Sequence, residues 1–160
     1  MRRKRRVILF GILVVMLVSG GFWVYRQLLA TRCHAHVCMI ADAISLYCMD
    51  HGDNLPARMS ELNGYANPSI FVCPSTGSKP GQMTNVDDWM DYVYLPWGSR
   101  TNTPPDYPML YDRRIRHPGR MINIVYVDCG TVEGDKNAKE LKQFAAEHPD
   151  INVPMPEGLK

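Results

Sequence analysis

The chain has 160 residues, of which 46% are hydrophobic, and its formal net charge at pH 7 is +2. Once an N-terminal apolar segment and its helical continuation are set aside, about 110 residues remain, enough for one small domain and too few for two. The cluster Arg2 to Arg6 supplies five positive charges, so the rest of the chain is slightly acidic. This distribution offers no basic surface for nucleic acid.

Residues 1–6 are basic, and residues 7–25 contain no charged side chain. A helix over that apolar segment would be roughly 28 Å long, close to the thickness of the hydrocarbon core of a bilayer. Only Arg26 and Arg32 follow it closely, so the positive-inside rule places the N-terminus in the cytoplasm. We therefore expect a single-pass inner-membrane protein with its domain in the periplasm.

A cleaved signal peptide is the alternative interpretation of the same segment. The basic start, the apolar run Val7 to Val18 and the small residues Ser19 to Gly21 satisfy the pattern of a signal-peptidase site. Apolar residues continue through Phe22 to Tyr25, however, with aromatic rings where a membrane-interface belt would lie. Both interpretations export the rest of the chain.

Residues 26–52 read as a continuation of the same helix outside the membrane. Apolar side chains recur there at spacings of three or four and form one stripe, which is expected to cover a core: Cys33, Val37, Ile40, Ile44, Tyr47 and Cys48. Gly52 can adopt the left-handed conformation of a helix C-cap, and Pro56 cannot continue a helix. The helix is therefore expected to end at Asp50.

Residues 53–148 are rich in turns and short extended runs, which predicts a small antiparallel β-meander and an α+β fold. The candidate strands are Ile70–Cys73, Tyr92–Leu95, Met109–Tyr111, Ile122–Val127 and Thr131–Glu133. The last two should form a hairpin through a tight turn at Asp128-Cys129-Gly130. An amphipathic helix is expected over Ala138–Glu147, and prolines predict a flexible tail over residues 149–160.

The order of these features resembles the type IV pilin-like proteins, and within them the pseudopilins and the prepilin-type proteins with a His-x9-Asp-Gly signature. The resemblance runs from about Arg2 to Glu133 and rests on the basic cluster, the long helix with Cys33 and the segment 40–47, then Asp53-Asn54-Leu55-Pro56, Phe71-Val72-Cys73-Pro74-Ser75, His117 and Asp128-Cys129-Gly130. It implies a non-enzymatic structural subunit of a secretion or pilus-type assembly, homo- or hetero-oligomeric. Cys73, Pro74, His117, Asp128 and Gly130 would then have structural roles.

The sequence departs from that family at two places. Arg6 stands where a glycine normally precedes the processing site, and Gly11 stands where a glutamate normally pairs with a neighbour's N-terminal amine. In addition, ten residues rather than nine separate His117 from Asp128, a difference that a one-residue bulge could absorb. The missing glycine and glutamate favour a second function class, a solitary membrane-anchored binding module that has lost prepilin processing, whereas the long continuous helix and the strand motifs favour the structural subunit.

The five cysteines would face an oxidising compartment, where disulfides persist. We expect a bond between Cys48 and Cys73, although sequence alone leaves the connectivity open. His34 and Cys38 lie four apart on one helix face, a spacing that can hold a metal. An exported metal or redox protein is therefore a third function class, ranked below the other two because packing of small residues explains the same pattern.

The aspartates Asp87, Asp88 and Asp91 precede a candidate strand. Carboxylates are the ligands that calcium prefers, and the major pseudopilin of type II secretion binds calcium in its strand loops. Calcium is thus the one cofactor that the resemblance suggests. The residues do not match an EF-hand, and the alternative is a solvated acidic face.

Overall fold

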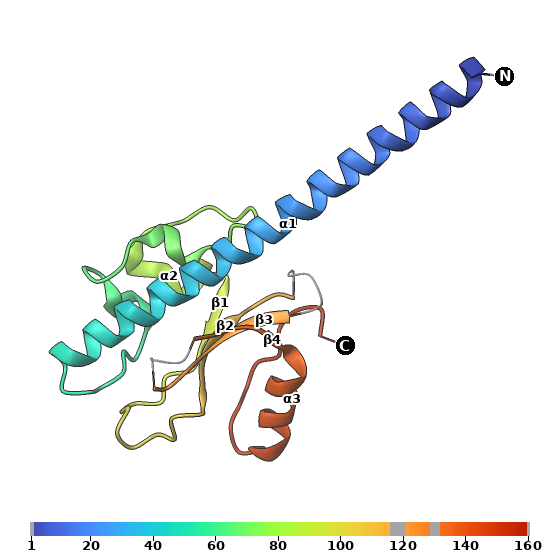
Figure 1. Ribbon diagram of the computed structural model, residues 1–160. Coiled ribbons are helices and arrows are strands. Elements are labelled where there is room, and N and C mark those ends of the chain that lie inside the picture. The colour runs from blue at the N-terminus through green and yellow to red at the C-terminus, as the bar shows by residue number, and fades with distance from the viewer. Residues whose placement is uncertain (1, 116–120, 129–131, 160) are drawn as a thin grey trace.

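The computed structural model describes the backbone of residues 2–115, 121–128 and 132–159, and the side chains of residues 10–115, 122–128 and 138–159. A long helix, α1 (Arg2–Asp50), lies across one face of a four-stranded antiparallel sheet (Figure 1). The strands are β1 (Tyr92–Tyr94), β2 (Pro108–Asp112), β3 (Met121–Tyr126) and β4 (Val132–Asn137), in the order β1-β2-β3-β4. Helix α3 (Ala138–Glu147) packs on the opposite face. The α+β fold with a meander is confirmed.

Helix α1 ends at the residue that the sequence predicts. Gly52 and the following Asp53 both have positive φ, 62° and 61°, a conformation that glycine and, less readily, aspartate tolerate. The Asp53 amide donates to the Cys48 carbonyl over 2.9 Å, which satisfies an acceptor of the last helical turn. The helix therefore stops where residues 51–53 turn the chain back into the domain.

The two halves of α1 have different surroundings. The first half projects away from the domain (Figure 1), whereas the second half packs against it. The predicted apolar stripe is confirmed by the burial of Cys33, Val37, Ile40, Ile44 and Cys48, each fully inaccessible to solvent. Tyr47 packs at the edge of this core.

The sheet separates two apolar clusters because successive side chains of a strand point to opposite faces. Leu110 and Val125 belong to the cluster beneath α1, whereas Tyr111, Ile122 and Ile124 belong to the cluster under α3. Strands β3 and β4 pair antiparallel, as the predicted hairpin requires, with an irregularity between Ile122 and Ile124. Strand β4 begins within the predicted segment 131–133 and extends further, to Asn137.

The segment before β1 contains short helical turns. The prediction of a strand over Ile70–Cys73 is therefore wrong. These turns are η1 (Met59–Leu62), η2 (Pro68–Phe71), η3 (Met83–Asn85) and α2 (Val86–Trp89). The Asn67 side chain accepts a hydrogen bond from the Ser69 amide over 3.0 Å and begins η2. Asparagine followed by proline starts a turn, and this local signal outweighs the apolar run that follows it.

The C-terminal tail is held against the sheet, contrary to the prediction of a flexible segment. The Tyr111 hydroxyl donates to the Pro154 carbonyl over 2.6 Å. The Glu157 amide donates to the Arg113 carbonyl over 2.8 Å, and the Ile115 amide donates to the Glu157 carbonyl over 3.1 Å. Prolines exclude regular secondary structure from the tail, but they do not prevent it from pairing with the residues that follow β2.

Candidate functional site: the outer side of α1 and the polar core beneath it

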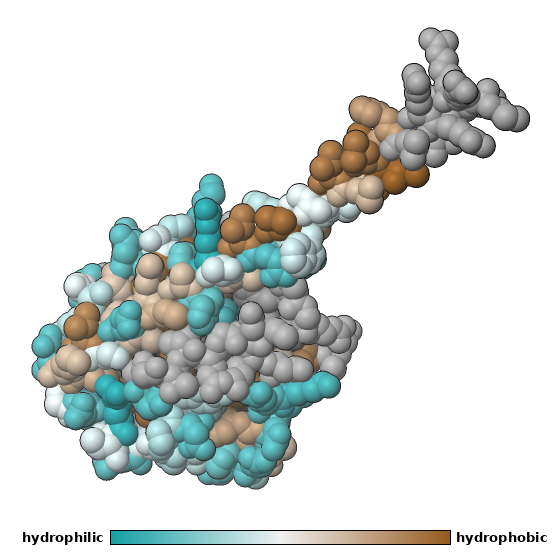
Figure 2. Space-filling view, in the orientation of Figure 1, coloured by the Kyte–Doolittle hydropathy of each residue, from teal (hydrophilic) through white to brown (hydrophobic). Residues whose placement is uncertain are grey.

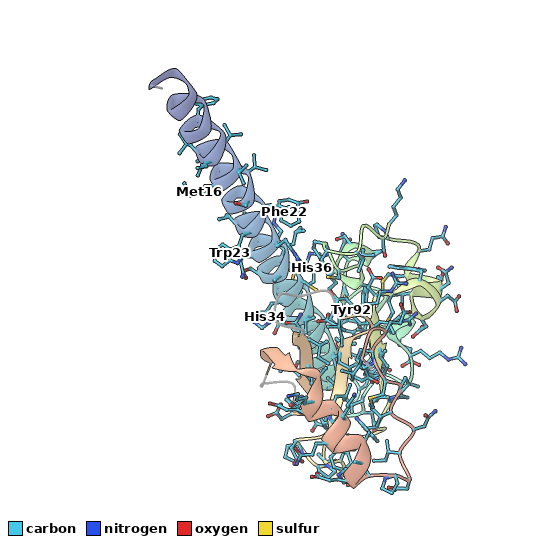
Figure 3. The ribbon with its side chains drawn as sticks, turned by 90° about the vertical axis from the view of Figure 1, so that its right-hand side faces the viewer. Met16, Phe22, Trp23, His34, His36 and Tyr92 are labelled. Atoms are coloured by element: carbon cyan, nitrogen blue, oxygen red, sulfur yellow. The ribbon has the colours of Figure 1, made fainter. Side chains whose placement is uncertain are left out.

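The projecting half of α1 is apolar, and its side chains are exposed. Phe10, Val18 and Trp23 are among its exposed side chains, with 69%, 67% and 63% of their surface accessible. Figure 3 shows Phe22 and Trp23 on different sides of α1, both beyond the domain, and Figure 2 shows the projecting part of α1 as more apolar than the visible surface of the domain. Among the described residues, α1 is the one helix long and apolar enough to cross a membrane.

An apolar stripe continues along the outer side of α1 beyond this segment. Leu28, Met39 and Leu46 are about half exposed. Phe10, Leu28 and Leu46 are spaced by five full turns of helix and therefore lie on the same side. This outer stripe (Phe10, Leu17, Leu28, Met39 and Leu46) lies opposite the side chains that α1 buries in the domain. The half of α1 that packs on the domain is thus apolar on two opposite sides.

Two exposed charges flank the outer stripe. Arg32 and Asp42 are both solvent-exposed, and ten residues of helix place them about 15 Å apart along the axis of α1. They are too distant to pair with one another in one chain. They are available to a neighbouring molecule that lies along the stripe.

A buried polar cluster lies beneath the inner side of α1. The Cys33 thiol lies 3.6 Å from the Tyr92 hydroxyl and 3.6 Å from Asp112 Oδ1. Asp112 Oδ2 accepts from the Asn123 amide over 2.7 Å and from Asn123 Nδ2 over 2.9 Å. Burial raises the pKa of Tyr92, so its phenol stays protonated and can donate. The cluster joins α1, β1, β2 and β3.

The sequence patterns do not predict this cluster. Cys33, Tyr92 and Asn123 fall within a predicted apolar stripe or strand, and Asp112 lies just beyond a predicted strand. One signal was available, because Asn123 interrupts the apolar run of the strongest predicted strand, and an amide in a buried strand requires hydrogen-bonding partners. The partners themselves are distant in sequence.

The histidines of α1 contact the domain. His34 Nδ1 lies 3.3 Å from Asn123 Oδ1, and its Nε2 lies 3.7 Å from the Cys38 thiol, as the helical spacing predicts. His36 Nδ1 lies 2.9 Å from the Val72 carbonyl. No group of three histidine, cysteine or acidic side chains that could hold a metal occurs within the described residues. The His34–Cys38 pair therefore has no third ligand in that part of the chain.

The predicted calcium ligands do not converge, which corrects that expectation. Asp87 accepts hydrogen bonds from the Met59 and Ser60 amides, over 2.8 and 3.1 Å, and so caps η1. Asp88 is exposed on α2. Within the described residues these aspartates form no group that could hold a metal ion, and the Asp87 carboxylate is used to hold η1.

Asp91 accepts hydrogen bonds from the loop that follows η2. The residue is 8% exposed, and its carboxylate accepts from the Cys73 amide over 3.0 Å, the Thr76 hydroxyl over 2.6 Å and the Ser78 hydroxyl over 3.0 Å. The motif residues Cys73 and Pro74 are therefore shaped by hydrogen bonds to a side chain of the next segment. Three donors from the protein satisfy a carboxylate that the sequence assigned to a metal.

The expected bond between Cys48 and Cys73 is not formed in this structure. Cys73 instead lies in hydrogen-bonding contact with Cys33. The reason is the direction of α1, along which Cys33 and Cys48 are separated by about 22 Å. The loop after η2 crosses the helix near its entry into the domain, so Cys73 meets Cys33, and Cys48 lies near Arg100.

The remaining motif residues are placed only in part. Asp128 follows β3, its carbonyl accepts from Arg100 over 2.8 Å, and it lines an open depression with Asp53 and Thr101. His117 and Gly130 lie outside the described residues, as does Cys129.

Searches of protein-family models, of curated proteins and of solved structures found no match to this chain.

Proposed function

We propose that this protein is a membrane-anchored, pilin-like structural subunit that assembles through α1 with further pilin-like subunits of its own or another kind, and that it performs no catalysis. Its N-terminus would lie in the cytoplasm and its domain in the periplasm. One observation carries the proposal: the outer stripe runs without change of side from the membrane-spanning half of α1 into the half that packs on the domain.

An anchor alone does not require that stripe. Lipid covers the apolar side chains up to about Tyr25, since the hydrocarbon core spans roughly 20 helical residues. Leu28, Met39 and Leu46 lie beyond it and are half exposed. A helix in water normally keeps its outer side polar. Apolar residues on both sides of α1 indicate that the helix is buried on both sides in the working state, by its own domain and by another subunit.

The flanking charges supply a register for that packing. A parallel neighbour shifted by about 15 Å along the helix axis, the rise of ten residues, would place its Asp42 beside Arg32 of the first copy. Each copy would then use both charges, one toward each neighbour. In the resembling family a glutamate near the N-terminus pairs with the neighbour's amine; Gly11 cannot do so, and the Arg32–Asp42 pair is proposed to take over that role outside the membrane.

The alternative is a solitary anchored module that binds a partner. Arg6 and Gly11 favour it, because the positions normally needed for cleavage and docking are changed. The two functions differ in what covers the outer stripe, which is a second subunit in one case and solvent in the other.

Photo-crosslinking in membranes separates them. The full chain is produced with a photoreactive phenylalanine analogue at Leu46, on the outer stripe, or at Lys142, an exposed residue of α3 on the far side of the sheet. Subunit assembly predicts crosslinked dimers and longer ladders from Leu46 and few from Lys142. Equal yields from both positions, or no ladder from Leu46 when all partner subunits of the host system are co-produced, would contradict the proposal.

The register is tested by charge exchange. Arg32→Asp and Asp42→Arg should each reduce the Leu46 ladder, because like charges then face each other between copies. The double variant R32D/D42R should restore it. Two single variants without effect would show that the charges do not set the packing.

A further inference from the structure

We infer that Cys33 and Cys73 form a disulfide bond in the exported protein, which ties α1 covalently to the loop after η2. The inference rests on the proposed periplasmic location of the domain. Both thiols are buried, with 0% and 5% of the residue exposed, and they contact each other directly. They come from segments that share the same apolar core.

The contacts around the two thiols hold them together from both sides. On the helix, His36 lies one turn after Cys33, and its Nδ1 is 2.9 Å from the carbonyl of Val72, the residue before Cys73. On the loop, the Cys73 amide is held by Asp91 over 3.0 Å. Asp91 precedes Tyr92, whose hydroxyl is 3.6 Å from the Cys33 thiol. In the folded structure the backbone on each side of the pair is therefore held in place by contacts other than the bond itself.

The remaining described cysteines lack such an arrangement. Cys38 is partly exposed and contacts His34, and Cys48 is buried near Arg100. Cys33 and Cys73 are thus the pair that the fold selects among these four thiols.

The step is a thiol–disulfide exchange. The oxidant is a protein disulfide of a periplasmic thiol oxidoreductase; the sulfur of one thiolate displaces one sulfur of that disulfide to give a mixed disulfide, and the second thiol of the chain displaces the oxidoreductase. Two protons leave the chain, one S–S bond forms and one breaks, and the oxidoreductase is released as a dithiol.

The bond should form while the domain is folding. The Cys73 contact and burial raise the pKa of Cys33, so its thiolate is scarce in the native state, and neither thiol is accessible to an enzyme. The same burial would protect the completed bond from reductants. The disulfide would link α1 covalently to the domain, so that a force applied to α1 in an assembly would not separate the two.

The test is disulfide mapping of the full chain. Membranes are dissolved in denaturant that contains N-ethylmaleimide, so that buried thiols are also blocked; the protein is then digested without reductant, and the peptides are identified by mass spectrometry. We expect one linked pair, Cys33 with Cys73, two hydrogens lighter than the separate peptides. Cys48→Ser should leave that pair intact, whereas Cys33→Ser should leave Cys73 alkylated. The wild-type map is decisive even if Cys33→Ser does not fold.

Location is measured in parallel, by protease access to the domain in sealed spheroplasts. A domain that is accessible while Cys33 and Cys73 are both alkylated would overturn the disulfide and leave the proposed topology intact. An inaccessible domain with free thiols would overturn the topology and, with it, the disulfide in cells. The mapped bond should also make the protein melt about 10 °C or more higher than protein that was unfolded, reduced with dithiothreitol and refolded in its presence.

Discussion

Replacement of Asp91 by alanine tests whether the aspartates hold the fold or a metal. The variant removes the acceptor for the Cys73 amide and for two hydroxyls. Cys73 is buried, so its amide loses its partner away from water, at a cost of about 1–3 kcal/mol. The Thr76 and Ser78 hydroxyls can turn to solvent and add about 0.5 kcal/mol each. The expected destabilisation is therefore about 2–4 kcal/mol.

The assay is thermal unfolding of the full chain in detergent micelles, followed by near-UV circular dichroism. For a domain of this size the loss corresponds to a melting temperature roughly 10–20 °C lower. Asp91→Asn should lose less, because the amide oxygen still accepts from Cys73. Asp88→Ala, the exposed neighbour, is the matched control and should melt within about 2 °C of the wild type.

Adding or removing calcium distinguishes a structural role of Asp91 from a metal-binding role. If Asp91 is saturated by protein donors, excess calcium or a chelator should leave the melting temperature of the wild type unchanged. The reasoning is refuted if Asp91→Ala melts with the wild type. It is refuted equally if calcium raises the melting temperature of the wild type and Asp91→Ala abolishes that rise.

Three further outcomes follow from the packing and the charges. Ile44→Ala should lower the free energy of unfolding by about 2–5 kcal/mol in urea titrations, because the side chain is fully buried. Leu46→Ala, half exposed on the outer stripe, should change it by less than about 0.5 kcal/mol yet weaken assembly; the opposite order would show that the faces of α1 are misassigned. The hydrogen bond to Glu61 raises the pKa of Tyr47 to about 12. This pKa lies above the unfolded value near 10, so the stabilisation from the protonated phenol is present below pH 10 and is lost between about pH 10 and 12. In an ultraviolet titration, Tyr47→Phe should lack one tyrosine ionisation that the wild type shows near pH 12. Deletion of residues 151–160 should destabilise the domain by about 1–3 kcal/mol through the loss of the hydrogen bonds to β2 and its end, whereas a free tail would leave the urea midpoint unchanged.

The elements that the sequence predicted well are those specified by neighbouring residues. The extent of α1 follows from an uninterrupted helical pattern and from Gly52, whose positive φ ends it. Helix α3 and strand β3 likewise follow from the local period of apolar residues. The wrong prediction at Ile70–Cys73 also concerns local signals. An apolar run of that length is compatible with a strand, but Asn67 and Pro68 start a helical turn there.

The candidate sites were predicted less well because their members are far apart in the chain. Cys33 meets Tyr92, Asp112 and Asn123 across 59, 79 and 90 residues. No local pattern states which thiol lies over which loop, or that Asp91 will be surrounded by hydrogen-bond donors. Residue type indicated metal and disulfide chemistry at these positions, and geometry assigned the same residues to other partners.

By itself the sequence determined that a charge-free apolar segment leads into one continuous helix and a small antiparallel sheet, because period, charge and turn residues act over a few neighbours. Only the tertiary structure decided which side of that helix the domain covers, which thiol lies beside Cys73 and which side remains open along the outer stripe. Those outcomes depend on how distant segments pack on α1, since burial and hydrogen bonding are properties of the assembled core.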